Sequence, residues 1–411
     1  MTLTPRPYQI IGRDFLAGRR VALLADQMRV GKTPQAILAA HKLGARRITV
    51  LCPAIAVPQW EYEFRRWYEA LGAAILPQIV VRSYDYARRH PEIVQRACDV
   101  AIIDEAHFAR NPDAQRTKLV YGKNSLGWHA GHIWALSGTP MPNHPGELWP
   151  MLRAFGKTRM HYEEWVDRYC IVNRLTLRPI GTKPNYVEEL CAMLATVMLR
   201  RTLAEVAPEM PTLAIDTLCI PGVAPDGDPN AAHLDDAALL RYLTQTAAHD
   251  AELRTATAMA KVKGLLDHVA FAIENSLMAQ TIVFGHHIEP LRMLTDGLCA
   301  RGISAAMLTG ETSTMRRAMI QQDFSASRIS VVVANIQVAG TAIDFSAADC
   351  GFFLEQSWVP VDNLQAAHRI VSLDRKTPPA FQVVTWPGSF DERVQRVLIR
   401  KMDGIRAAGL A

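Results

Sequence analysis

Two short stretches contain the residues that could handle a nucleoside triphosphate. The first, DQMRVGKT (26–33), ends in Gly-Lys-Thr, as the phosphate-binding pattern G-x-x-x-x-G-K-[ST] does. The pattern's first glycine falls on Asp26, and Arg29 stands where a small residue would fit more easily. In such a loop a lysine reaches the β- and γ-phosphates and a hydroxyl holds Mg²⁺. The stretch predicts an ATP and Mg²⁺ site with Lys32 and Thr33 in those roles; the alternative is an ordinary turn between a strand and a helix.

The second stretch, CDVAIIDEAH (98–107), is an apolar run that ends in two adjacent carboxylates. Asp104 could hold Mg²⁺ through water, and Glu105 could orient and deprotonate an attacking water. Ligands of parallel sheets collect at the carboxyl ends of the strands, which is where this pair would stand. Because the pair follows the Gly-Lys-Thr by about 70 residues, we interpret both as one hydrolytic site; the alternative for the second stretch is an exposed acidic turn.

These residues need parallel strands to position them, and short β-branched runs alternate with helical stretches along the chain. A stretch rich in Pro, Gly and Asp (221–230) separates two sets of such runs. We interpret it as a linker between two α/β lobes; the alternative is a surface loop inside one domain. The expected strands are 21–25, 48–52, 100–104 and 132–136 in the first half, and 281–284, 330–334, 351–355 and 381–385 in the second.

The composition sets broad limits on the class of protein. The 411 residues are enough for two or three domains. A formal charge of +5 is compatible with a nucleic-acid partner but does not by itself indicate one. The seven cysteines are scattered without a CxxC pair, so neither a zinc ribbon nor a redox motif is supported. No apolar run approaches the roughly 18 residues of a membrane span, so no membrane partner is expected.

The order of the motifs resembles the SWI/SNF-type ATPases of helicase superfamily two, in particular the compact branch that includes the annealing helicases. The resemblance runs from RPYQ (6–9) to FDERVQRVLIRKM (390–402). Members often read D-E-M-G-L-G-K-T at the phosphate loop, which accounts for Asp26. The resemblance implies an α/β fold of two tandem RecA-like lobes, each a parallel sheet flanked by helices, that close around ATP. The expected parts are lobe one (1–215, with a helical protrusion near 150–200), a linker (216–250) and lobe two (251–411).

The resemblance also assigns site residues. Gln9 would read adenine, and Ser137 and Thr139 of LSGTP would couple hydrolysis to DNA contact, although both hydroxyls could equally be turn caps. The segment VMLRRTLAEVAPEMP (197–211) resembles the stretch that closes lobe one in the family. The alternative for its paired Arg200 and Arg201 is a solvated face. The expected nucleotide contacts are Gln9, Arg29, Gly31, Lys32, Thr33, Gly340 and Asp344. The expected DNA contacts are Pro53, Ser137, Thr139, His286, Gly310, Thr312, Ser313 and Trp358.

The last motif, LQAAHRIVSLDR (364–375), departs from the family form Q-A-E-D-R-A-H-R-I-G-Q. Aligned from Gln365, the first arginine falls on Arg369 and the second on Ser372. In the family both reach the γ-phosphate, and such a residue contributes on the order of 10³–10⁵ in turnover. Several interpretations remain open: Arg375 or Arg29 supplies the missing charge, hydrolysis is slow, the alignment is wrong, or the enzyme is effectively inactive.

The sequence thus predicts an ATP-dependent translocase on double-stranded DNA, with salt-dependent contacts mostly to phosphate. The rival hypotheses are a nucleotide-switched DNA clamp with slow turnover and an RNA-directed helicase. We expect a cytoplasmic protein of a bacterial or phage-infected cell; the sequence does not indicate its protein partners.

Overall fold

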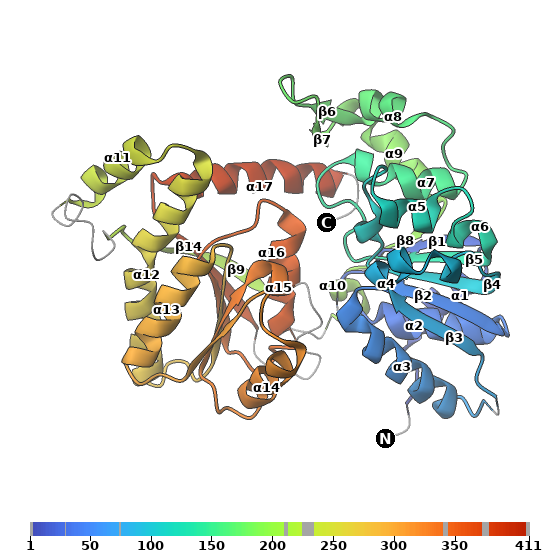
Figure 1. The fold of residues 1–411 in the computed structure, drawn as a ribbon, viewed down its shortest axis with the longest axis horizontal. Helices are drawn as coiled ribbons and strands as arrows, with labels where there is room; N and C mark the ends of the chain where they lie inside the picture. The colour runs from blue at the N-terminus through green and yellow to red at the C-terminus, as the bar shows by residue number, and fades with distance from the viewer. Residues whose placement is uncertain are drawn as a thin grey trace. The chain divides into compact units, whose positions relative to one another are not determined.

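The computed structural model describes residues 3–28, 30–73, 75–208, 213–223, 234–339, 344–371 and 378–407. The chain divides into two compact units (Figure 1): the first is Met1–Pro208 with Arg400–Ala411, and the second is Glu209–Ile399. Within these described ranges no helix combines the length and the hydropathy that a membrane span requires. Each unit is built on one six-stranded sheet.

The first unit has an all-parallel sheet with the strand order β3-β2-β4-β5-β1-β8. Its central strands are buried on both faces, which is why they read as uninterrupted apolar runs in the sequence. The four strands expected in this half are confirmed. The strands are β1 (Val21–Leu24), β2 (Arg47–Cys52), β3 (Gln78–Ser83), β4 (Cys98–Asp104), β5 (Ala130–Leu136) and β8 (Met198–Leu199).

Helices cover both faces of this sheet and create one apolar core on each (Figure 1). One core packs α1 (Pro7–Ala17), α2 (Lys32–Lys42) and α3 (Val57–Ala70) on the sheet. The other is built from the helices α5 (Gln115–Tyr121), α6 (Leu126–His129), α7 (Trp149–Ala154), α8 (Tyr162–Tyr169) and α9 (Val187–Ala195), with α4 (Tyr84–Arg89) beside them. The short α10 (Leu203–Val206) follows β8.

The region near 150–200, expected to be a helical protrusion, is not purely helical. An antiparallel hairpin of β6 (Cys170–Val172) and β7 (Pro179–Thr182) stands between α8 and α9. The helical prediction therefore missed two short strands, which are too brief to show an alternating pattern.

The second unit has a parallel sheet with the order β11-β12-β10-β13-β14-β9. One core packs α12 and α13 on one face, and the other packs α14 and α16 on the opposite face. The strands are β9 (Ala214–Cys219), β10 (Thr281–Gly285), β11 (Ala305–Leu308), β12 (Val331–Asn335), β13 (Cys350–Phe353) and β14 (Ala380–Thr385). The helices are α11 (Asp236–Thr246), α12 (Asp250–Glu274), α13 (Ile288–Ala300), α14 (Thr314–Ser325), α15 (Ile336–Ala339), α16 (Pro360–Ala367) and α17 (Phe390–Ala407).

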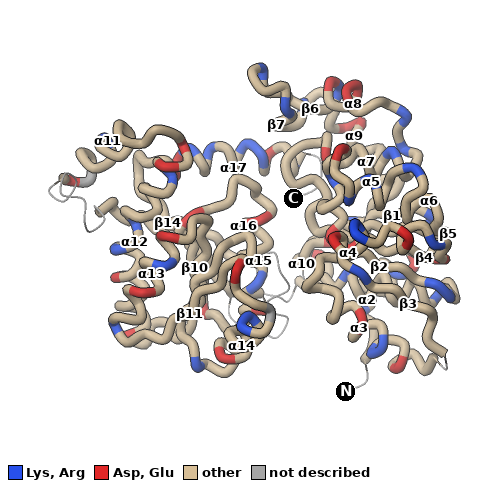
Figure 2. Tube along the Cα trace, in the orientation of Figure 1, with Lys and Arg blue, Asp and Glu red and all other residues tan. Residues whose placement is uncertain are grey.

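The expected domain boundaries need two corrections. Residues 216–250, predicted as a linker, contain the end of β9, which pairs with β14, and all of α11. At the other end, α17 leaves the second unit, and its residues Met402 and Ile405 join an apolar core of the first unit. Figure 2 shows the Lys and Arg residues along this helix. Apolar residues of α17 thus belong to clusters of both units. The prediction that residues 251–411 form one lobe is therefore wrong for residues 400–411.

A fully buried lysine holds the second unit together. Lys261 of α12 donates from Nζ to the carbonyl oxygens of Leu354, at 2.7 Å, and Val384, at 2.8 Å. The same ammonium lies 2.9 Å from the carboxylate of Asp391 at the start of α17. One cation therefore ties α12 to the ends of β13 and β14 and to α17.

We predict that Lys261→Met lowers the free energy of unfolding of this unit by about 3–5 kcal/mol, because it removes the buried cation that pairs with the partly buried carboxylate of Asp391. Urea denaturation measures the change. Lys263→Met, at an exposed position on the same helix, should change it by less than about 0.5 kcal/mol. Equal effects of the two substitutions would show that the buried cation has no structural role.

Candidate functional site

Gly31 forms the junction between the phosphate loop and α2. Its φ is +80°, in the left-handed region that favours glycine, and it caps the amino end of the helix. A Cβ at this position would stand 3.0 Å from Nε2 of Gln9. Gln9 also accepts a hydrogen bond from the Arg6 amide at 2.9 Å, which fixes its side chain. The structure therefore brings Gln9 to the loop, and glycine is favoured at position 31 by its positive φ and by the close approach of the Gln9 side chain.

Lys32 lies over its own loop. Its Nζ donates to the carbonyl oxygens of Asp26, at 2.8 Å, and Gln27, at 3.3 Å. Burial lowers the pKa of Lys32, against the opposing fields of Glu105, Asp26 and Asp104. The acids at the end of β4 thus act on the lysine of the loop, as one hydrolytic site requires. Thr33 follows in the first turn of α2.

Asp104 at the end of β4 is held by two hydrogen bonds. Trp60 donates from Nε1 to Oδ2 at 2.7 Å, and the Glu105 amide donates to Oδ1 at 3.0 Å. The pKa of Asp104 is raised by its removal from water and by the charge of Glu105, and it is lowered less strongly by Trp60 and Lys32. The carbonyl of Asp104 also accepts from the Tyr84 hydroxyl at 2.7 Å. Neither Trp60 nor Tyr84 was predicted as a site residue, because folding brings them to Asp104 from 44 and 20 positions away in the chain.

Glu105 begins the turn after β4 in a strained conformation. Its φ is +48°, which is uncommon for a residue other than glycine and costs energy that the surroundings must supply. Its carboxylate lies 3.3 Å from Nδ1 of His107, which in turn lies 3.1 Å from the Ser137 hydroxyl. That hydroxyl accepts from the amide of Thr139 at 3.2 Å. A chain of contacts therefore joins the acidic turn to the loop after β5.

The burial of the two hydroxyl groups in LSGTP (136–140) changes the predicted role of this segment. Ser137 is fully buried and Thr139 is 7% exposed, so neither hydroxyl is on a surface that DNA could touch. Their predicted direct DNA contacts do not fit this geometry. Their contacts instead suit the coupling part of the prediction, since they lie against the acidic turn. Pro53, by contrast, follows the end of β2 and is only partly buried.

Asp26 occupies the place of the missing glycine and is fully buried. Arg201 meets its carboxylate with two hydrogen bonds, at 3.0 and 2.5 Å, and Gln35 donates to the same carboxylate at 3.1 Å. Arg201 also donates to the Tyr8 carbonyl at 2.6 Å, and Arg200 donates to the Ala25 carbonyl at 2.9 Å. The suggestion that the two arginines form a solvated face is therefore wrong: both fasten the loop.

In the second unit the expected DNA contacts follow the carboxyl ends of parallel strands. His286 follows β10, Gly310 follows β11 and Trp358 follows β13. Parallel strands end at a common edge of their sheet, so the topology gathers these residues on one edge. Gly310 is exposed, whereas His286 and Trp358 are partly buried. The ring of Trp358 packs edge-on against Phe390 at 5.8 Å.

The loop 309–313 is internally braced. The Thr312 hydroxyl accepts from the Thr309 amide at 3.0 Å, and Ser313 caps α14 by accepting from the Arg316 amide at 3.3 Å. Arg317 donates to the carbonyls of Thr312, at 2.8 Å, and Gly310, at 3.0 Å. Arg317 is therefore a brace of this loop and not simply an exposed cation.

Glu355 organises the segment after β10 and was missed from the sequence. It accepts from the amides of His286, at 3.0 Å, and His287, at 2.9 Å, and lies 2.6 Å from Nδ1 of His287. Burial opposes its ionisation, but these interactions outweigh burial and lower the pKa of Glu355. Burial and the charge of Arg254 lower the pKa of His286. The carboxylate thereby fixes the backbone on which His286 stands.

Of the other predicted residues, Arg369 is partly buried in a short 3₁₀ helix (His368–Ile370), and its carbonyl accepts from the Phe345 amide at 3.1 Å. Asp344 is exposed and caps the following turn by accepting from the Ser346 amide at 3.1 Å. Arg29, Gly340, Ser372 and Arg375 lie outside the described residues.

Comparisons with known proteins identify sequence relatives of this chain. The chain is 25% identical to "SWI/SNF-related matrix-associated actin-dependent regulator of chromatin subfamily A-like protein 1" of Xenopus laevis over 98% of this chain and 44% of the relative. It is 23% identical to "DNA annealing helicase and endonuclease ZRANB3" of Homo sapiens over 89% of this chain and 37% of the relative. The chain thus spans less than half the length of these curated relatives.

One solved structure and two family models also match. The structure, "Sulfolobus solfataricus SWI2/SNF2 ATPase core in complex with dsDNA", is 19% identical with a TM-score of 0.45, over 100% of this chain and 94% of that one. The model of the helicase conserved C-terminal domain matches residues 260–373. The model of the SNF2-related domain matches residues 8–220, more than half of the chain. The chain therefore belongs to the SNF2-related family of the SWI/SNF type.

Proposed function

We propose that this chain is an ATP-driven motor that translocates on double-stranded DNA. The observation that carries the proposal is that Lys32, Asp104 and Glu105 lie in one unit, where the charges of the two acids oppose the loss of the lysine's proton. Family membership supports ATP as the nucleotide, and the names of two relatives and one solved structure refer to chromatin, DNA annealing and dsDNA. The phosphate loop and the acid pair would hydrolyse ATP, and the protein would move along double-stranded DNA.

The residues of the first unit fit Mg²⁺ and a triphosphate. Asp104 offers a fixed carboxylate of the oxygen type that Mg²⁺ prefers, and Thr33 stands in the first helical turn of the loop. Gly31 leaves the space that a Cβ would fill. Bound ATP would supply the phosphoryl group that is transferred to water. We assign Lys32 to the phosphates, Thr33 and Asp104 to Mg²⁺, and Gln9 to the adenine.

Glu105 is the residue that we assign as the base for water. Its strained turn points a carboxylate from the end of β4, and His107 and Ser137 connect that turn to the loop after β5. A shift of that loop would therefore move the base. We further propose that Arg369 of the second unit completes the charge around the γ-phosphate, as its motif position implies. The phosphate contacts to DNA are assigned to Pro53, Gly310, Thr312 and Ser313.

We predict that Glu105→Gln lowers duplex-stimulated phosphate release on the order of 100-fold or more, because the amide cannot accept the proton of water. Phosphate release with and without duplex DNA measures it. The control is Glu163→Gln on α8, an exposed glutamate, which should leave the rate unchanged.

Two results of this assay would contradict the motor. ATP-dependent retention of DNA without phosphate release by the unmodified chain would indicate a clamp, which the serine at position 372 makes a specific alternative. Stronger stimulation by RNA than by duplex DNA would indicate an RNA-directed enzyme.

The raised pKa of Asp104 predicts a pH dependence of Mg²⁺-nucleotide binding. Mg²⁺ requires the carboxylate, so affinity is present above this pKa and is lost as the pH falls through it. Trp60→Phe removes a hydrogen bond that lowers the pKa, so the loss should move to higher pH. Titration of Mg²⁺·ADP at several values between about pH 5 and 8 measures the shift.

The matched control is Trp67→Phe on the same helix, since the Trp67 ring nitrogen has no hydrogen-bond partner among the described residues. It should leave the wild-type midpoint in place. Identical pH profiles for the wild-type protein and Trp60→Phe would rule out Asp104 as the titrating ligand.

Position 372 separates two alignments of the last motif. If Ser372 replaces an arginine, Ser372→Arg raises phosphate release at least about tenfold. The A-H-R-I of the family form, however, coincides with Ala-His-Arg-Ile at 367–370. In that register Arg369 is the second arginine, and we therefore expect an unchanged rate. A tenfold gain would contradict this register and show that the native site lacks a needed charge.

A further inference from the structure

A large pocket opens in the first unit near the amino end of β1, away from the phosphate loop. Its volume is about 770 Å³, within the range of small-ligand sites. Arg20, directly before β1, and Ile133, its neighbour on β5, lie in its wall, together with residues of α5, α6 and α7. Lys32 follows the opposite end of β1. The pocket is therefore separate from the proposed nucleotide site.

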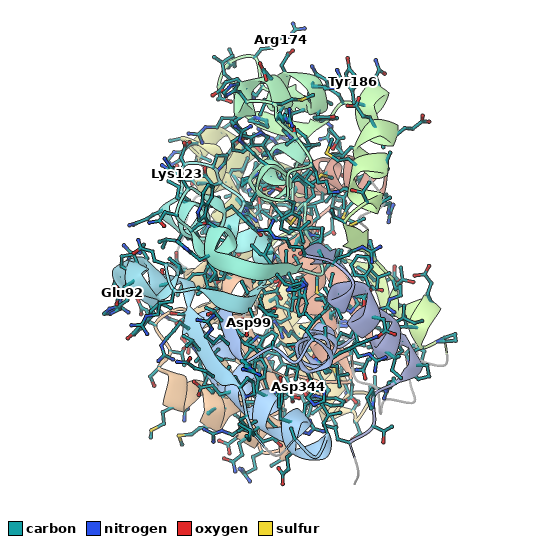
Figure 3. All side chains as sticks on the ribbon, turned by 90° about the vertical axis from the view of Figure 1, so that its right-hand side faces the viewer. Glu92, Asp99, Lys123, Arg174, Tyr186 and Asp344 are labelled. Atoms are coloured by element: carbon teal, nitrogen blue, oxygen red, sulfur yellow. The ribbon has the colours of Figure 1, made fainter. Side chains whose placement is uncertain are left out.

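The pocket is lined by positive charges. Its basic residues are Arg20, Lys118, Lys123 and Arg153, and none of the described residues that line it is acidic. Arg20, Lys118 and Lys123 are exposed and form no ion pair with any residue in the described ranges; Lys123 is labelled in Figure 3. Arg153 donates only to backbone carbonyls, at 2.9 Å each. Cations of one sign around a concave surface attract an anion.

An open aromatic face lies beside these charges. Trp128 of α6 is 66% exposed and lines the pocket. No ring or cation of the described residues packs on it. Trp149, also in the wall, is already covered, because the guanidinium of Arg153 lies 5.5 Å from its ring centre. A tryptophan with a free face next to lysines is a platform on which a nucleic-acid base can stack.

The wall also contains polar groups without partners. The hydroxyls of Thr117 and Tyr121 are buried and make no hydrogen bond to the described residues. Buried hydroxyls normally have a partner. Because neighbouring protein atoms cover these two oxygens, they do not define the ligand of the pocket. The positive charges and the open aromatic face together describe a ligand that has an anion and an aromatic ring.

We propose that this pocket binds a nucleotide unit with an unpaired base, either a free nucleotide or part of a single strand. The base would stack on Trp128, and the phosphate would lie between Lys118 and Lys123. Paired bases in a duplex are stacked on one another and cannot offer a free face. An acidic peptide would match the charges but not the open ring. The inference goes beyond the motor activity and does not rest on it.

The test uses the full chain without ATP and a fluorescein-labelled single-stranded oligothymidylate of about eight nucleotides, whose anisotropy reports binding. Trp128→Ala, Lys118→Glu and Lys123→Glu should each weaken binding about tenfold. Two controls change matched exposed residues of α12: Lys263→Glu repeats the charge reversal, and Phe271→Ala, at a side chain that is 60% exposed, repeats the loss of an aromatic ring. Both should bind like the wild-type protein.

Competition with thymidine 5′-monophosphate then identifies the source of the ligand. Displacement of the oligonucleotide shows that a free nucleotide suffices, and its absence shows that a strand is needed; both support the proposal. Equal binding by pocket and control variants would overturn it, as would displacement by polyglutamate from the wild-type protein and Trp128→Ala alike. Duplex-stimulated phosphate release should stay within about twofold in all pocket variants, so failure of the motor proposal would be seen separately.

Discussion

The buried pair of Asp26 and Arg201 is the constraint on which the first unit depends. The carboxylate is fully buried and the guanidinium is 13% exposed, so each charge needs the other. The pair fastens the loop after β1 to the segment after β8, although these are 175 positions apart in the chain. A glycine at position 26 could not make this bond. Asp26 therefore anchors the loop through its ion pair, where a glycine would lack this attachment. The anchored loop holds Lys32 within the electrostatic field of the acids that end β4.

The other consequence of this geometry is coupling. The charges of Asp104 and Glu105 act on Lys32, and a protein interior of low polarity strengthens such interactions. His107 connects the acidic turn to Ser137 in the loop after β5. That loop also approaches Lys32, since a Cβ at Gly138 would lie 3.4 Å from Nζ of Lys32. A displacement of the loop after β5 therefore changes the surroundings of the Glu105 carboxylate and of Lys32. Such a connection suits an enzyme in which another ligand controls hydrolysis.

The features that could be predicted from the sequence are those that appear as local patterns of residues. Parallel strands buried on both faces, such as Ile48–Cys52 or Val100–Asp104, appear as apolar runs, and the phosphate loop and acid pair appear as motifs. It missed β9, whose side chains are mostly exposed at a sheet edge, and so misplaced the linker. It also missed Trp60 and Glu355, because their partners are 44 and 69 or 68 positions away and only folding brings them together. The burial of Ser137 was unpredictable for the same reason.

We assign the loop and the acid pair to one nucleotide site, and direct binding tests this assignment without dependence on turnover or DNA. Calorimetric titration of Mg²⁺·ADP into the wild-type protein, Lys32→Ala and Lys42→Ala compares the loop lysine with an exposed lysine of the same helix. We expect one site in the wild-type protein, unchanged affinity for Lys42→Ala, and affinity at least about tenfold weaker for Lys32→Ala. Equal affinity of Lys32→Ala and wild-type protein would contradict it.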